Sequence, residues 1–133
     1  MTTFDIEESH GVWFDMDSGG RVKLKTATPS DWLKIKKAIT EKDPIIKKLE
    51  DGKYQLFEHV IIDEDLQMSM LNDICIIDWE NLFDKNRNPI PCTPENKMLL
   101  MMMRDDSFRD FVNEKMTTLA EMELEQRRVS EKN

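Results

Sequence analysis

Polar and apolar residues alternate near the start of the chain in the manner of a β-strand. The run RVKLK begins at Arg21 and has the period of two that places successive side chains on opposite faces. Residues 11–16 also have strand-like composition, and the turn-forming run DSGG at 17–20 lies between the two segments. Glycine accepts the positive φ angles of a tight turn. The pattern therefore predicts a β-hairpin over residues 11–27.

Helical spacing follows the hairpin, and it begins at a clear start signal. The run TPSD at 28–31 combines a capping hydroxyl, a proline at the first helical position and an acid in the first turn. Asp43-Pro44 predicts the start of a second, short helix, which ends near Gly52. The segment 54–62 fits an extended or a helical conformation, and we interpret it as irregular.

The second half of the chain also has mainly helical spacing. Between Asp63 and Trp79 the apolar residues recur at intervals of three and four, which predicts a helix. The run TPEN at 93–96 repeats the earlier start signal and opens a methionine-rich helix, and a last helix from about Asp106 carries an apolar stripe. Polar residues 124–133 have little to bury, so we expect them to fray.

These elements predict an α+β, mainly helical fold. We expect the N-terminal β-hairpin to pack on a bundle of about four to five helices, which cover residues 29–122. A chain of 133 residues fits one compact domain. We place this single globular domain at residues 11–123, after a flexible N-terminus at 1–10.

Charge and composition limit the class of protein. The formal net charge is −8, which opposes attraction to nucleic-acid phosphates. Residues 21–53 are nevertheless basic, with ten Lys or Arg against five Asp or Glu, so oppositely charged regions of neighbouring copies favour a homo-oligomer. No apolar run reaches the roughly 20 residues of a membrane helix, and the N-terminus is unlike a signal peptide. We therefore expect a cytoplasmic protein without nucleic-acid or membrane partners.

The sequence gives little support for catalysis or for a metal. It has two histidines and lacks both a recognisable nucleophile motif and a glycine-rich phosphate loop, so we expect no enzyme and no cofactor. Oxygen-bearing residues do follow calcium-loop spacing, namely Asp84, Asn86, Asn88 and Glu95. Pro89, however, stands where that loop requires glycine, and its fixed φ opposes the sharp turn. We therefore expect no metal there.

Methionine is unusually frequent near the C-terminus. The chain has ten methionines, and the run at 101–103 places three in succession. Successive helical side chains point about 100° apart, so at least one of the three must face solvent or a partner. Flexible methionine side chains suit either an irregular core or an adaptable binding surface, and both interpretations stay open.

The segment from Ile77 to Lys97 resembles the tail assembly chaperones of long-tailed bacteriophages and prophages. The resemblance is carried by Asp78, Trp79, Glu80, Asp84, Asn88, Pro89, Pro91, Thr93, Pro94, Glu95 and Asn96, and by the run FRDFV at 108–112. In that family a Trp at a helix end is followed by a turn, an extended Pro-x-Pro, a helix start and a final amphipathic helix. Asn88 stands where glycine is usual, and Asn tolerates the same backbone region.

The resemblance implies a non-catalytic protein of the bacterial host cytoplasm. Such chaperones coat the tape measure protein until tail tube subunits polymerise around it, so the tape measure protein and the tail tube protein are the expected partners. A structural component of the tail is the alternative. We predict an apolar partner-binding groove on the last two helices, at Met98, Met102, Phe108, Phe111 and Leu119.

Overall fold

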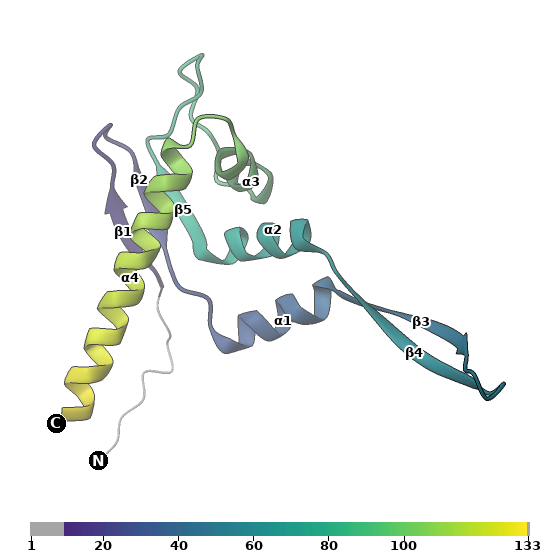
Figure 1. Ribbon diagram of the computed structural model, residues 1–133. Coiled ribbons are helices and arrows are strands. Elements are labelled where there is room, and N and C mark those ends of the chain that lie inside the picture. The colour runs from purple at the N-terminus through teal and green to yellow at the C-terminus, as the bar shows by residue number, and fades with distance from the viewer. Residues whose placement is uncertain (1–9, 133) are drawn as a thin grey trace.

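The chain folds around a small sheet that the N-terminal hairpin begins. The computed structural model describes residues 10–132 (Figure 1). Strands β1 (Val12–Asp15) and β2 (Arg21–Leu24) pair antiparallel, and the Met16 N–H donates to the Gly20 carbonyl at 2.8 Å across the turn. Strand β5 (Ile76–Glu80) adds to the other edge of β2, giving the order β1-β2-β5. The predicted hairpin is therefore one part of a three-stranded sheet.

The predicted arrangement of one N-terminal hairpin on a bundle of four to five helices is wrong, because strands are spread through the chain. Strands β3 (Thr40–Lys48) and β4 (Tyr54–Ile62) form a separate antiparallel pair. They replace the short helix expected after Asp43 and the segment interpreted as irregular. Strand β5 likewise replaces the end of the helix predicted between Asp63 and Trp79. Pairing with β2 buries Ile76 and Trp79 of β5, and the aromatic and β-branched residues of β4 favour extended backbone over helix.

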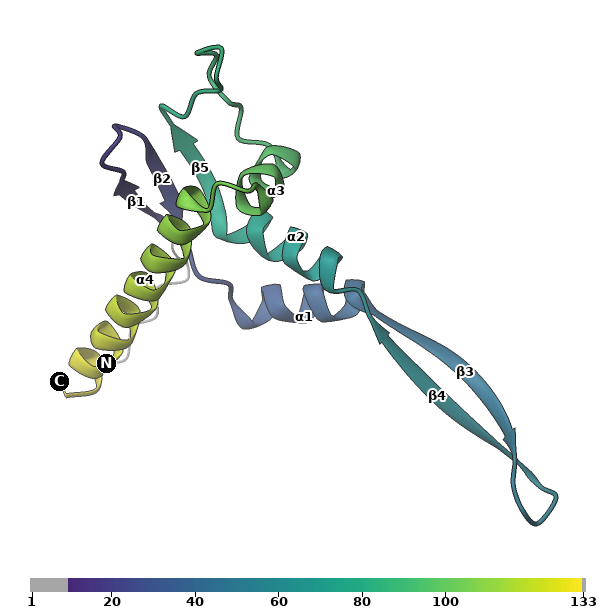
Figure 2. The same cartoon turned by 45° about the horizontal axis from the view of Figure 1, so that its top comes forward.

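Four helices complete the described part of the chain. Helices α1 (Pro29–Ile39) and α2 (Glu64–Cys75) lie side by side, and α3 (Pro94–Met102) packs against α2 (Figures 1 and 2). Helix α4 (Ser107–Lys132) runs along the sheet and contacts β2. It continues past the point where we predicted fraying. Of the N-terminal segment predicted to be flexible, residues 1–9 lie outside the described residues, as does residue 133.

Local capping explains where the helices begin. The Thr28 hydroxyl accepts the Asp31 N–H at 3.1 Å, and the Asp31 carboxylate accepts the Thr28 N–H at 2.9 Å, which is a reciprocal capping box. The Thr93 hydroxyl accepts the Asn96 N–H at 3.2 Å at the start of α3. The helix starts predicted at Thr28 and Thr93 are confirmed.

The core lies between the sheet and the two C-terminal helices. It contains Val22, Leu24, Ile76 and Trp79 from the sheet, and Met101, Phe108, Val112 and Leu119 from α3 and α4. The rings of Trp79 and Phe108 meet edge to face, with centroids 5.8 Å apart. This geometry is favourable for aromatic pairs and fixes the start of α4 over β5.

Candidate functional site

The most exposed feature of the molecule is a β-ribbon that we call the arm (residues 40–62). Its two nine-residue strands pair in one uninterrupted register, from Thr40 opposite Ile62 to Lys48 opposite Tyr54. The arm leaves the ends of α1 and α2 and projects away from the body (Figures 1 and 2). Every residue of both strands except Thr40 is exposed.

Local sequence explains why the arm forms a ribbon. Strand β4 is rich in the aromatic and β-branched residues that favour extended backbone. At the tip, Gly52 supplies a φ of +86°, and the Asp51 carboxylate accepts the Lys53 N–H at 3.0 Å. At the base, the Asp63 N–H donates to the Ile39 carbonyl at 3.0 Å and joins the ribbon to the two helices.

The arm exposes apolar side chains on both faces. Alternate residues share a face, so the even-numbered residues of both strands form what we call the even face. That face carries Ile46, Tyr54 and Leu56, which are 69%, 70% and 62% exposed. The opposite face carries Ile45, Phe57 and Ile61, which are also exposed. An isolated two-stranded ribbon is marginally stable in water, so this amount of apolar surface indicates a binding element.

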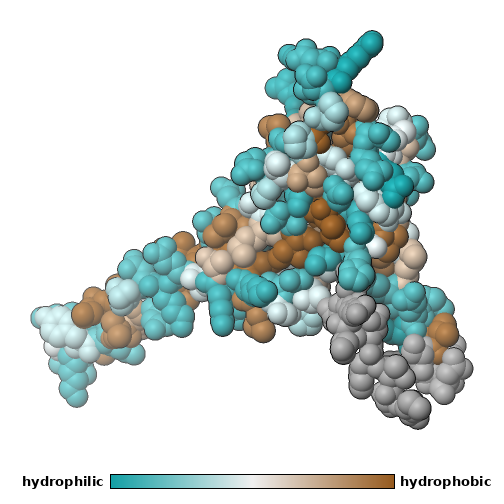
Figure 3. Space-filling view, turned by 180° about the vertical axis from the view of Figure 1, so that it is seen from behind, coloured by the Kyte–Doolittle hydropathy of each residue, from teal (hydrophilic) through white to brown (hydrophobic). Residues whose placement is uncertain are grey.

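A second apolar surface is a groove in the body. It has a volume of about 340 Å³ and lies where α1, α2, α3 and α4 converge. Its apolar lining residues are Ala27, Trp32, Leu71, Cys75, Ile76, Met101, Val112 and Met116. Hydrophobic surface also crosses the middle of the body in Figure 3. The groove can admit a few apolar side chains of a partner, and two flexible methionines can adjust to their shape.

The five residues predicted to bind a partner do not lie on one surface. Phe108 and Leu119 are only 5% and 3% exposed and belong to the core, and Phe111 packs against that core. Met98 is half-buried, and its sulfur accepts the Asn72 side-chain N–H at 3.3 Å. Met102 is exposed. The groove uses neighbouring methionines instead, and a binding role for the five stays a prediction.

Sequence reasoning missed the arm and the lining of the groove. For the arm a signal existed, because residues 54–62 are rich in β-branched and aromatic side chains. For the groove, no local pattern in the sequence showed that Trp32 and Met116 would line the same surface.

The segment that carries the family resemblance forms a tight connector between β5 and α3. Trp79 lies on β5 and not at a helix end, and its indole N–H donates to the Ile90 carbonyl at 2.7 Å. The Ile90 N–H donates to the Leu82 carbonyl at 2.8 Å. Residues Asn81 and Arg87 take positive φ angles of 59° and 63°, so the left-handed geometry expected at Asn88 is supplied elsewhere. The other residues of the resemblance, Asp78, Glu80, Pro89, Pro91, Thr93, Pro94, Glu95 and Asn96, all lie within β5, this connector or the start of α3.

The calcium-loop spacing noted in the sequence corresponds to a structural turn. One carboxylate oxygen of Asp84 accepts the Asn86 N–H at 2.8 Å and the Asn88 N–H at 3.0 Å. Within residues 10–132, no three His, Cys, Asp or Glu side chains come together in a way that could hold a metal ion. Asp84 therefore has a clear structural role as the acceptor that closes the turn.

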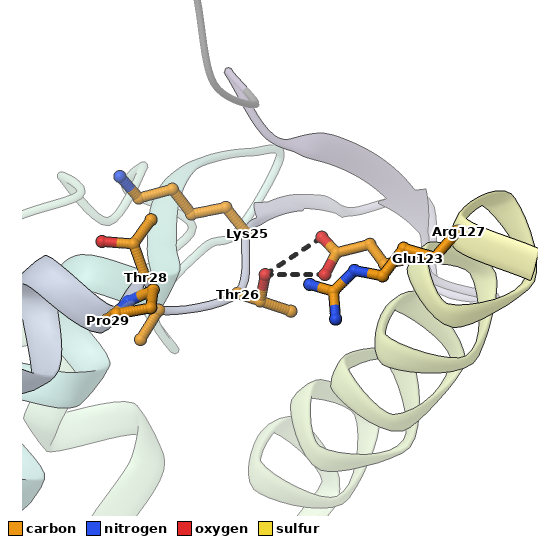
Figure 4. A pocket seen from close by; sticks show the side chains of 7 residues that line it. Lys25, Thr26, Thr28, Pro29, Glu123 and Arg127 are labelled. Atoms are coloured by element: carbon orange, nitrogen blue, oxygen red, sulfur yellow. Dashed lines mark hydrogen bonds between the residues drawn. The ribbon is translucent and has the colours of Figure 1, made fainter. Parts of the chain in front are cut away.

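A polar pocket of about 260 Å³ lies beside α4 (Figure 4). Its polar side chains include Lys25, Thr26, Glu123 and Arg127. The Thr26 hydroxyl lies 3.0 and 2.9 Å from the two carboxylate oxygens of Glu123 and donates to one of them at a time. This contact ties α4 to the connection between β2 and α1, which forms one wall of the groove.

The chain was compared with protein-family models, curated proteins and solved structures. None of these comparisons gave a match. No helix in the described part of the chain combines the length and apolar character needed to span a membrane.

Proposed function

We propose that the protein is a non-catalytic binding protein, and specifically a phage tail assembly chaperone that holds the tape measure protein before tail polymerisation. The observation that carries the binding role is the arm, with apolar side chains exposed on both faces. The resemblance of residues 77–97 supports the choice of partner.

The groove supports a chaperone in particular. A chaperone must cover apolar segments that vary along its partner and must later release them. Met101 and Met116 line the groove beside Trp32, and polarisable, flexible methionines accept varied apolar shapes. The net charge of −8 on this chain favours solubility, and we place the protein in the bacterial cytoplasm.

A structural component of the tail is the second candidate function. Projecting β-ribbons suit permanent contacts between subunits as well as transient ones, because an exposed edge can complete a neighbour's sheet. The two functions differ in one observable. A structural component, such as one bound to the tail tube protein, stays in purified particles, whereas a chaperone is absent from them.

The first test is co-expression of the protein with the tape measure protein encoded in the same genome. We expect the two to co-purify and the tape measure protein to become soluble. If the tape measure protein stays insoluble and unbound, the chaperone proposal fails and the structural role takes its place.

Matched variants then locate the binding surface. Trp32→Asp places a charge at the groove, whereas Leu99→Asp places one on an exposed residue of α3 that does not line it. We expect at least a tenfold loss of bound tape measure protein for Trp32→Asp and little change for Leu99→Asp, with far-UV circular dichroism confirming that both fold. Met102→Asp tests the surface predicted from sequence. If all three variants lost binding of the tape measure protein equally, the groove would not be the specific binding surface.

A further inference from the structure

The two outer edges of the arm differ in how well they are protected against pairing. Five of the nine residues of β3 are charged, and Pro44 lies in its middle. In contrast, β4 has Glu58 as its one formally charged residue at neutral pH and contains no proline. Charged residues and proline are the devices that keep edge strands from pairing with other chains. The outer edge of β3 is therefore protected against pairing with another chain, whereas the outer edge of β4 is available for it.

Backbone geometry shows which groups the open edge presents. The Asp63 N–H donates to the Ile39 carbonyl and the Leu49 N–H to the Lys53 carbonyl, so odd-numbered residues make the hydrogen bonds within the arm. Even-numbered residues therefore direct their N–H and C=O groups outward. On β3 this places the missing N–H of Pro44 on the outer edge. On β4 all five outward-facing residues have an N–H group.

Strand β4 is nearly symmetric in its apolar positions about His59. Reading outward from that residue, Leu56 corresponds to Ile62, and Phe57 corresponds to Ile61. An antiparallel copy of β4 centred on His59 would thus place Phe57 opposite Ile61 and Leu56 opposite Ile62, while Glu58 would lie opposite Val60. In this register the even-numbered residues of the two copies would hydrogen-bond to each other. These are the residues whose N–H and C=O groups point outward from the free edge of β4.

We infer that β4 of the arm pairs edge to edge with β4 of a second copy of this chain, around a two-fold axis at His59. The product is a four-stranded antiparallel sheet in which the even faces of the two arms are continuous. It pairs the row of backbone groups that each arm alone leaves open. This interface is independent of the tape measure protein and is formed by the chain alone.

Charge also favours a second copy as the occupant of the edge. The arm carries four lysines and five acidic residues, so two arms repel each other little. In the proposed register the tip of each arm reaches the base of the other, where α2 begins. The tip, residues 47–53, has three lysines and two acidic residues, whereas residues 63–65 at the base are all acidic. Opposite charges therefore meet at both ends of the paired arms.

Two proline variants, placed at one residue pair of the arm, test which edge pairs with the second copy. Val60 and Lys42 lie opposite each other, and both direct their N–H groups outward, so neither substitution removes a hydrogen bond within the arm. In sedimentation equilibrium, we expect Val60→Pro to raise the protein concentration at which half of the dimer has dissociated by at least tenfold. Lys42→Pro should assemble like the original chain. Equal effects of both substitutions, or a chain that is monomeric throughout, would overturn the inference.

A cysteine at the two-fold axis provides the second test. Residues at a non-hydrogen-bonded antiparallel position have Cα atoms about 4.5 Å apart, which a disulfide can bridge. Under mild oxidation we expect His59→Cys to give a covalent dimer on a non-reducing gel. Gln55→Cys is the control, because its two copies would lie about 26 Å apart. The original chain, oxidised in the same way, shows how much crosslinking comes from the native thiols of Cys75 and Cys92. Equal crosslinking of the two variants, or none, would contradict the register.

Discussion

Replacing Trp79 by Phe should loosen the connector that leads from β5 to α3. Trp79 is 6% exposed, and its indole N–H donates to the Ile90 carbonyl at 2.7 Å. Phenylalanine retains an aromatic ring opposite Phe108 but has no N–H group. The variant therefore removes the anchor of the loop while preserving most of the aromatic pair.

Two effects contribute to the expected loss of stability. Leaving the Ile90 carbonyl without its donor costs about 1–3 kcal/mol, and the lower part of that range applies because Ile90 is half-buried and water can reach it. The smaller ring leaves a space in the core, which costs about 1–2 kcal/mol. We expect the free energy of unfolding to fall by about 2–4 kcal/mol, a large part of the roughly 5–15 kcal/mol typical of a domain.

Urea unfolding followed by far-UV circular dichroism measures this change. Trp32→Phe is the matched control, because Trp32 is a partly exposed residue of α1, and a change there should cost less than about 0.5 kcal/mol. If Trp79→Phe costs no more than the control, the contact with Ile90 does not hold the connector, and the reasoning is refuted.

Three further predictions concern ionisable groups. The Thr28 N–H lowers the pKa of Asp31, so its stabilisation is present above the unfolded pKa and is lost as pH falls through the folded value. Asp31→Asn should cost about 0.5–1 kcal/mol at pH 7 in urea unfolding, and the difference should vanish in acid. Lys97 is buried, and its ammonium lies 3.0 Å from a carboxylate oxygen of half-exposed Asp73. Asp73→Ala should therefore cost about 1–3 kcal/mol, and thermal unfolding should show a smaller loss for Lys97→Met, which leaves no buried charge. Burial raises the pKa of the Cys75 thiol, so mass spectrometry should detect slow alkylation in the native protein and fast alkylation in urea.

Features that depend only on neighbouring residues could be predicted from the sequence. The turn at 17–20 and the helix starts at Thr28 and Thr93 formed where they were predicted. In each case a short run contains both the donor and the acceptor, or the glycine whose φ the turn requires. Such signals are independent of the rest of the chain and can be read locally.

Elements that depend on distant segments of the chain could be identified only once the packing of the whole chain was known. Pro44 suggested a helix start, but its strand is defined by pairing with β4, and Ile76–Glu80 became a strand because β2 offers an edge. The apolar stripe of α4 was visible in sequence, yet packing alone placed Phe108 and Leu119 in the core. Periodicity reports which side chains avoid water, whereas strand pairing and burial depend on segments far away in the chain. The arm and the groove, which carry the proposed function, are of this second kind.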